Sequence, residues 1–382
     1  MTEFSFDALR RHPDVEAENL FAVDAADRLL LDEASAALEA TIDEPGTVVV
    51  IGDAYGALTL GAAAVLGIGG IRVHQDSLSG ELALAENARR FPGLDLSRRF
   101  RSLPLGPELL QGAKVVLLRL PRSLGELDDL ARAIAAWADP AVEVYAGGRL
   151  KHMTTAMNEV LESAFDSVTA TLARQKSRVL IARGRREGIG AALHHREFHD
   201  DLGLWVCATG GAFAGTKIDI GTRFLLPHLD AMKPDARGGS ALAIDLGSGT
   251  GVLAAALARS RPELRVVATD QSAAAVASTR ETLAANGLAG VEVVRDDALS
   301  GFDDASADLI VLNPPFHMGS TVYAGIALKL FEAAGRVLAP GGELWTVFNS
   351  HLSYRAALQR AVGPTRQVDR NTKFTVMVST RR

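Results

Sequence analysis

The chain has a single cysteine, Cys207, among its 382 residues, so it can form neither an internal disulfide nor a thiolate metal cage. Its nine histidines include no H-E-x-x-H pattern, which is the spacing of a helical zinc site. We therefore expect a protein that works without a metal ion.

An excess of positive charge is also missing. The net charge is −6 and the sequence pI is ≈ 5.9, which argues against a non-specific binder of polyanions. The first residues, Met1–Asp14, contain no apolar stretch typical of a signal peptide. The longest apolar run, Ala54–Ile71, is broken by glycines and indicates a turn and a buried helix rather than a membrane span. We expect a cytoplasmic protein with no membrane partner.

Apolar, β-branched runs alternate with alanine-rich stretches in both halves of the chain. We expect strands at Val48–Ile51, Ile71–His74, Val115–Leu118, Val142–Ala146, Ala241–Leu246, Leu264–Thr269, Val291–Arg295, Leu309–Leu312, Glu343–Phe348 and Phe374–Ser379. We expect helices at Ala57–Leu66, Leu82–Arg90, Leu124–Ala138, Gly251–Ser260, Ser272–Asn286 and Ala324–Leu338. This alternation predicts an α/β protein with two tandem Rossmann-like domains, residues 1–185 and 186–382, each with a parallel, doubly wound sheet.

The two halves align with each other at a nearly constant shift. Ile51–Leu58 matches Leu246–Leu253 at a shift of 195 (246 − 51), and Leu118–Pro121 matches Leu312–Pro315 at 194 (312 − 118). A constant shift indicates the internal duplication of one fold.

A glycine-rich turn follows an apolar strand in the second half. Glycines let the backbone turn tightly and approach a ligand closely, because no Cβ intrudes. The spacing is G-x-G-x-G rather than the G-x-G-x-x-G of pyrophosphate binding, which favours S-adenosylmethionine over a dinucleotide. The predicted cofactor residues of this turn are Asp245, Gly247, Ser248, Gly249 and Gly251.

Carboxylates follow the next two predicted strands. Asp270, with Gln271 beside it, is placed to accept hydrogen bonds from the ribose hydroxyls of the cofactor. Asp296 and Asp297 close the third strand, where one carboxylate can accept from the adenine amino group and the Ala298 N–H can face the ring. We prefer Asp297 for the adenine contact.

The tetrad Asn313-Pro314-Pro315-Phe316 ends the fourth strand, at the sheet edge where ligands bind in open α/β folds. The Asn313 side-chain oxygen and the Pro314 carbonyl can each accept one N–H of a planar amine, and Phe316 can stack on a flipped-out base. We expect these four residues to be catalytic, and Asn313 to border the cofactor as well. His317 could carry away the proton that the amine loses.

These motifs resemble those of the bacterial ribosomal RNA guanine-N2 methyltransferases, which have two tandem domains of the class I methyltransferase fold. The resemblance rests on Asp219–Leu226, Asp245–Gly251, Asn313–His317 with Gly319, Asn349–Tyr354 and Asn371–Phe374. His317, the late segment Asn349–Tyr354 and Ala146–His152 are more similar to the large-subunit (23S) branch than to the small-subunit (16S) branch.

The resemblance implies S-adenosylmethionine as cofactor, ribosomal RNA as partner, and a first domain that is a degenerate copy with a structural or RNA-binding role. Arg119 replaces Asn313 there, and Ala54 and Tyr55 would crowd an adenosyl ligand, while Glu86 and Asn87 survive without evident use. We expect a monomer with one active site.

RNA contacts are expected from local positive charge, which is concentrated between residues 174 and 196. This stretch is either a solvated strand-and-loop connector or a phosphate-contacting surface. The candidates are Lys151, Arg174, Lys176, Arg178, Arg185 and Arg186. Competing functions are methylation of 16S ribosomal RNA, methylation of a protein glutamine at N5, and a non-catalytic adenosyl- or RNA-binding module.

Overall fold

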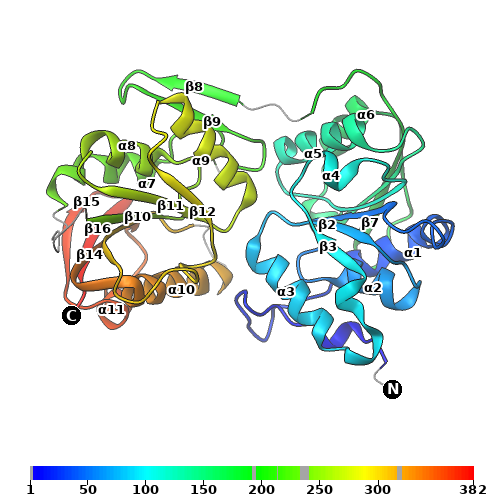
Figure 1. Cartoon of the computed structure of the whole chain (residues 1–382), viewed down its shortest axis with the longest axis horizontal. Coiled ribbons are helices and arrows are strands. Elements are labelled where there is room, and N and C mark those ends of the chain that lie inside the picture. Colours follow the sequence, from blue (N-terminus) through cyan, green and yellow to red (C-terminus); the bar gives the residue numbers. More distant parts are fainter. Residues whose placement is uncertain (1–2, 192–194, 213, 233–240, 316–320) are drawn as a thin grey trace. The chain divides into compact units, whose positions relative to one another are not determined.

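The structure is a computed structural model, which describes residues 3–191, 195–212, 214–232, 241–315 and 321–382 (Figure 1). The chain divides into two compact units, Met1–Leu193 and His194–Arg382, and each is described by itself. Within the described residues, no helix is both long enough and apolar enough to cross a membrane.

The first unit alternates helices and strands along most of its length (Figure 1). Its strands are β1 (Val48–Ile51), β2 (Ile71–His74), β3 (Phe100–Ser102), β4 (Val115–Arg119), β5 (Glu143–Arg149), β6 (Phe165–Ala170) and β7 (Ser177–Arg185). Its α-helices are α1 (Ala25–Glu39), α2 (Ala57–Val65), α3 (Leu78–Arg89), α4 (Pro107–Leu110), α5 (Leu124–Trp137) and α6 (Ala156–Ala164).

The second unit has the same alternation after an initial hairpin. The hairpin strands are β8 (His195–His199) and β9 (Leu204–Ala208). The remaining strands are β10 (Leu242–Leu246), β11 (Arg265–Asp270), β12 (Glu292–Arg295), β13 (Ala307–Leu312), β14 (Leu338–Asn349), β15 (Thr365–Arg370) and β16 (Phe374–Thr380). The α-helices are α7 (Ile220–Leu225), α8 (Val252–Ser260), α9 (Ala273–Ala285), α10 (Thr321–Val337) and α11 (Arg355–Ala361).

Each unit is built on a seven-stranded sheet, and the two sheets have the same topology. The strand order is β3-β2-β1-β4-β5-β7-β6 in the first and β12-β11-β10-β13-β14-β16-β15 in the second. In both sheets the first five strands are parallel and the last two pair antiparallel. The α/β fold class is confirmed, and the identical strand order supports an internal duplication.

The register of the sheets fixes which residues correspond. Ile51 of β1 lies beside Leu118 of β4, and Leu246 of β10 lies beside Leu312 of β13. Arg119 and Asn313 come directly after Leu118 and Leu312, so they occupy the same place in the two sheets.

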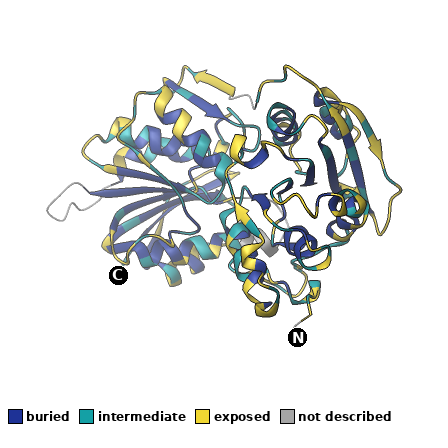
Figure 2. Ribbon diagram, turned by 45° about the vertical axis from the view of Figure 1, so that its right-hand side comes forward, coloured by how far each residue is buried: buried dark blue, intermediate teal, exposed yellow. Residues whose placement is uncertain are grey.

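The central strands of each sheet are buried on both faces, which is why strands such as β1 are apolar at every position (Figure 2). In β10, for example, Ile244 packs into the core on one face of the sheet and Ala243 packs into the core on the other. Polar groups therefore gather at the strand ends, where the candidate site residues lie.

The structure corrects several expectations. The stretch that begins at Arg174 is not a connector: β7 inserts between β5 and β6, and β8 begins the hairpin of the second unit. The helix expected to begin at Leu82 begins at Leu78, and α1, α6 and α11 were not expected at all. The two compact units divide after Leu193, and the expected domain boundary after residue 185 stays a prediction.

Candidate active site

Asn313 follows β13 directly, and its side-chain amide is held in one orientation. Its Nδ2 donates to Asp219 Oδ2 at 2.8 Å and to Thr222 Oγ1 at 3.0 Å. Its Oδ1 is buried and has no hydrogen-bond partner among the described residues. A buried acceptor without a donor is costly, so this oxygen is suited to an N–H brought by a ligand.

The residues that hold Asn313 come from the first turn of α7. Asp219 is the N-cap of this helix, and its Oδ2 also accepts from the N–H groups of Gly221 and Thr222. A Cβ at Gly221 would lie 3.1 Å from Asn313 Oδ1 and 2.9 Å from Asp219 Oδ2. Glycine at this position therefore keeps the space around the free oxygen open.

The structure describes two of the other three residues of the tetrad, Pro314 and Pro315. Pro314 is buried and Pro315 is exposed, at the carboxyl edge of the sheet. Phe316, His317 and Gly319 lie outside the described residues. The catalytic roles of Pro314, Pro315 and Phe316 stay predictions.

The glycine-rich turn between β10 and α8 adopts the conformation that the sequence suggests. Gly247, Gly249 and Gly251 all have positive φ, at 76°, 56° and 77°. A Cβ at Gly247 or Gly249 would meet nothing within 4 Å, whereas one at Gly251 would press on Thr279 at 2.9 Å. Gly247 and Gly249 therefore border open space that a ligand can occupy, and Gly251 is needed for packing.

Asp245 supplies a carboxylate beneath this turn. It is fully buried; its Oδ2 accepts from the Ala254 N–H at 2.9 Å, while its Oδ1 has no partner among the described residues. Burial, opposed by the bond from Ala254, raises the pKa of Asp245 to about 7. An orphaned, buried carboxylate oxygen can be satisfied by an ammonium or N–H donor of a bound cofactor.

The next predicted contacts lie on the same edge of the sheet. Asp270 Oδ2 accepts from the Gly249 N–H at 3.0 Å and its Oδ1 from the Ser272 N–H at 2.9 Å, so it ties the glycine turn to the start of α9. Gln271 follows it, half-buried. The Ser248 hydroxyl lies 3.0 Å from Thr279 Oγ1, and Ser248 is thus directed into the protein.

The two aspartates after β12 differ in their surroundings. Asp296 uses both oxygens on its own loop, where Oδ1 accepts from the Ser300 N–H and Oδ2 from the Gly301 N–H, each at 2.8 Å. Asp297 instead pairs with Lys329 of α10 through Oδ2 at 2.6 Å. Ala298 has a φ of 54°, a left-handed conformation that re-aims its backbone N–H.

The equivalent site of the first unit is filled by its own residues. The Arg119 guanidinium pairs with Asp24, at 2.9 Å, and with Asp27. Asp24 caps α1 as Asp219 caps α7, at a separation of 195 positions (219 − 24), and Asp27 stands where α7 has Thr222. The same cap thus holds the Arg119 guanidinium in the first unit and the Asn313 NH₂ group in the second, which leaves the Asn313 oxygen free.

The glycine turn of the first unit is also covered. Ala54 has a φ of 58° at the place of Gly249, and the Tyr55 hydroxyl donates to Asp14 Oδ2 at 2.5 Å while the Arg11 guanidinium lies over the Tyr55 ring. The N-terminal segment is held here by Asn87, which bonds to both backbone groups of Arg10. Asn87 therefore has a structural role, contrary to expectation, and so has Glu86, which pairs with His12.

The predicted RNA-binding residues differ in their partners and exposure, and their role stays a prediction. Arg174 pairs with Asp32 and Glu33, and Arg186 pairs with Asp166. Arg185 donates to the Ala135 carbonyl, Arg178 is half-buried, and Lys176 and Lys151 are exposed. Much of the positive charge between residues 174 and 186 is therefore neutralised by neighbouring carboxylates.

Sequence reasoning missed Asp219, Thr222 and Lys329 as site residues. Asp219 and Thr222 lie 94 and 91 positions before Asn313. The recurrence of an aspartate at the same shift, at Asp24, was a signal in the sequence that could have found the cap. Among the described residues, no group of three or more His, Cys, Asp or Glu side chains could hold a metal ion.

The fold and this site define a two-domain S-adenosylmethionine-dependent methyltransferase. The family model described as "Methyltransferase small domain" matches residues 203–378, and the one described as "RLMG N-terminal domain" matches residues 1–186. The chain belongs to the family of ribosomal RNA large subunit methyltransferase G, as its relatives show.

Two relatives of that name are each 34% identical to this chain. The one from Streptomyces avermitilis aligns over 97% of this chain and 96% of its own length, and the one from Pseudomonas aeruginosa over 98% of both. A solved structure of the T. thermophilus 16S rRNA N2 G1207 methyltransferase in complex with AdoMet and guanosine is 21% identical, with a TM-score of 0.73, and covers 96% of this chain and 97% of that one. This similarity shows that the two chains share a fold.

We predict that Asp245→Asn weakens binding of S-adenosylmethionine roughly tenfold. The asparagine oxygen is needed by the Ala254 N–H, so an amide NH₂ replaces the free acceptor oxygen. Isothermal titration calorimetry measures the affinity. Asp53→Asn is the matched control, because Asp53 is the buried carboxylate that caps α2 in the first unit. Equal reductions of affinity in the two variants would contradict a cofactor role for Asp245.

Proposed function

We propose that this protein transfers a methyl group from S-adenosylmethionine to the exocyclic N2 amine of a guanine in large-subunit ribosomal RNA. The observation that carries the proposal is the free, buried Oδ1 of Asn313, held beside the glycine turn of a methyltransferase domain. The relatives named ribosomal RNA large subunit methyltransferase G support the RNA class.

The cofactor binds at the carboxyl edge of the second sheet, and when bound it supplies an electrophilic sulfonium methyl. Asp245 and the open backbone of Gly247 and Gly249 would bind its amino-acid portion and the adjoining sugar, with Gln271 beside them, while Ser248 and Gly251 support the turn by packing against Thr279. Asp270, whose oxygens each accept one N–H, would accept from the ribose with its remaining lone pairs. Asp297 is the better candidate for the adenine amine, because Asp296 already accepts from three donors on its own loop, the Ser300 N–H and hydroxyl and the Gly301 N–H.

Asn313 orients the acceptor amine. The nitrogen of guanine N2 is a poor nucleophile, because its lone pair is delocalised into the ring. Asp219 and Thr222 fix the Nδ2 group of Asn313, so the side chain can present only its oxygen to the substrate. Oδ1 and the Pro314 carbonyl each accept one N–H, which holds the nitrogen towards the methyl group and favours its rehybridisation. Catalysis then rests on positioning and electrostatics.

The first domain has a structural and RNA-binding role rather than a catalytic one. Arg119 and its two aspartates fill the place of the acceptor amine, and Tyr55 lies beneath the N-terminal segment. All the proposed catalytic and cofactor residues belong to one unit of one chain, so a monomer suffices for the reaction, which we place in the cytoplasm.

Two other substrates would fit the tetrad equally and are disfavoured on other grounds. A guanine of 16S ribosomal RNA is favoured by the fold of the T. thermophilus enzyme, but not by the relatives that align over the whole chain. A protein glutamine would use Asn313 in the same way and leave the first domain without a role. A non-catalytic module would have no need of an amide oriented towards a substrate.

Nucleoside mass spectrometry of ribosomal RNA tests the proposal. A strain that lacks the gene is predicted to lose one N2-methylguanosine from 23S RNA and none from 16S RNA. The wild-type gene restores the modification and the Asn313→Ala gene does not. Unchanged RNA together with an undermethylated protein glutamine would refute the proposal.

We predict that Asp219→Asn lowers the single-turnover rate at saturating RNA by roughly tenfold, with S-adenosylmethionine affinity unchanged. The amide oxygen can take the place of Oδ2, which accepts from both the α7 N–H groups and the Asn313 NH₂, but without the negative charge it holds Asn313 less firmly. Asn313→Ala should abolish turnover and change cofactor affinity by no more than a few-fold.

Asp24→Asn is the control, since it alters the same helix cap in the first domain. It should leave the single-turnover rate at saturating RNA intact. Loss of cofactor binding in Asn313→Ala, or an equal fall of the rate in Asp24→Asn and Asp219→Asn, would contradict the role given to the Asp219–Asn313 contact.

A further inference from the structure

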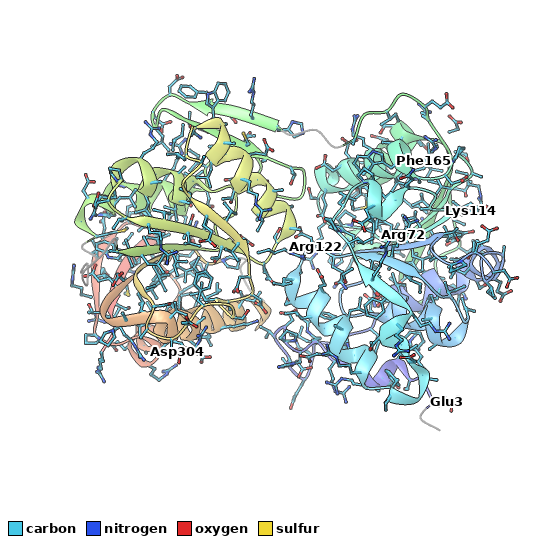
Figure 3. All side chains as sticks on the ribbon, in the orientation of Figure 1. Glu3, Arg72, Lys114, Arg122, Phe165 and Asp304 are labelled. Carbon is cyan, nitrogen blue, oxygen red and sulfur yellow. The ribbon has the colours of Figure 1, made fainter. Side chains whose placement is uncertain are left out.

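A cationic pocket lies at the carboxyl end of the first sheet, at the place that corresponds to the Asn313 site of the second. Its volume is about 340 Å³, and its walls include Asp24, Arg119, Arg122, Arg149, Lys151 and His152. Arg122 follows the end of β4 closely in the chain (Figure 3). The proposed reaction uses none of these residues.

The positive charge of this pocket exceeds what its carboxylates neutralise. Arg119 is balanced by Asp24 and Asp27. No ion pair or hydrogen bond involves the side chains of Arg122, Arg149 or Lys151 within the described residues, and the Nε of Arg149 is buried without a partner. Three cations therefore remain uncompensated at one site.

The positive charges of Arg122, Arg149 and Lys151 all affect the side chain of His152. Burial, followed by the charges of Arg122, Lys151 and Arg149, lowers the pKa of His152. In a protein of net charge −6, positive charge concentrated in this way and left without partners favours an anion from outside the chain.

We propose that this pocket binds a phosphate group of the RNA backbone. Arginine and lysine side chains that converge without carboxylate partners are suited to a phosphodiester, and the guanidinium fork can bind two of its oxygens. The proposal rests on the proposed function, because the phosphate belongs to the RNA substrate.

The surroundings favour a polymer over a free nucleotide. The glycine turn of the first unit carries Ala54 and Tyr55, and Tyr55 is covered by Arg11 and Asp14, so its own side chains cover the place where the second unit leaves room for a nucleoside. Arg122 and Lys151 are exposed. An RNA strand can present a phosphate to them while its bases stay outside the pocket.

The test is RNA binding by the full chain, measured by fluorescence anisotropy on a 23S RNA fragment over a series of salt concentrations. Arg122→Ala/Lys151→Ala is expected to raise Kd roughly tenfold and to reduce the slope of log Kd against log salt by about 0.7–0.9 for each phosphate interaction that the variant removes. Cofactor affinity should not change, because neither side chain belongs to the proposed cofactor site. The charge-retaining Arg122→Lys/Lys151→Arg variant should restore most of the affinity.

The matched control is Arg89→Ala/Arg99→Ala, which removes the same charge from exposed positions at the end of α3 and before β3, on the opposite edge of the sheet. Equal RNA affinity and equal salt slope in the two double variants would overturn the proposal. Binding of guanosine monophosphate or inorganic phosphate that is abolished in the pocket variant, with RNA affinity unaltered, would also overturn it. Failure of the wild type to methylate ribosomal RNA would instead refute the proposed function.

Discussion

The contact between the Asp219 carboxylate and the Asn313 amide connects the fold to the chemistry. One oxygen caps α7 and holds the NH₂ group of Asn313, which leaves the amide oxygen of Asn313 as a buried acceptor with no donor among the described residues. A planar amine bound there meets a fixed acceptor rather than a rotating side chain. Gly221 has no Cβ, which keeps the space in front of that oxygen open. The sequence at the start of α7 therefore determines how accessible the Asn313 side chain is at the end of β13.

The two units show how few residues separate the proposed catalytic site from a site that is filled by its own side chains. Strand order, helix cap and left-handed turn are shared. In the first unit Arg119 replaces Asn313 and Asp27 replaces Thr222, so an ion pair fills the site. Burying this pair requires charge balance, which explains why the arginine and the second aspartate occur together. The charges left over around Arg122 are the basis of the phosphate site that we propose for the first domain.

The sequence predicted those parts of the site that are local. The glycine turn, the tetrad and the carboxylates at strand ends are short patterns with a direct physical meaning, and the structure brings them to one sheet edge. Asp219 was not predicted as a site residue, because its partner Asn313 lies 94 residues away in the sequence and its local pattern is that of an ordinary helix cap. The strand β7 was not predicted, because its several arginines are typical of a solvated segment, although most of its apolar residues are buried. Asn87 was expected to have no evident use, because Arg10, the N-terminal residue that it binds, is 77 residues away in the sequence.

The most direct test of this account is a crystal structure with S-adenosylhomocysteine and guanosine bound. The account predicts that guanine N2 lies within hydrogen-bond distance of Asn313 Oδ1, with Asn313 Nδ2 still on Asp219 and Thr222. A guanine amine bound by Asp219 itself, or one bound away from Asn313, would contradict it.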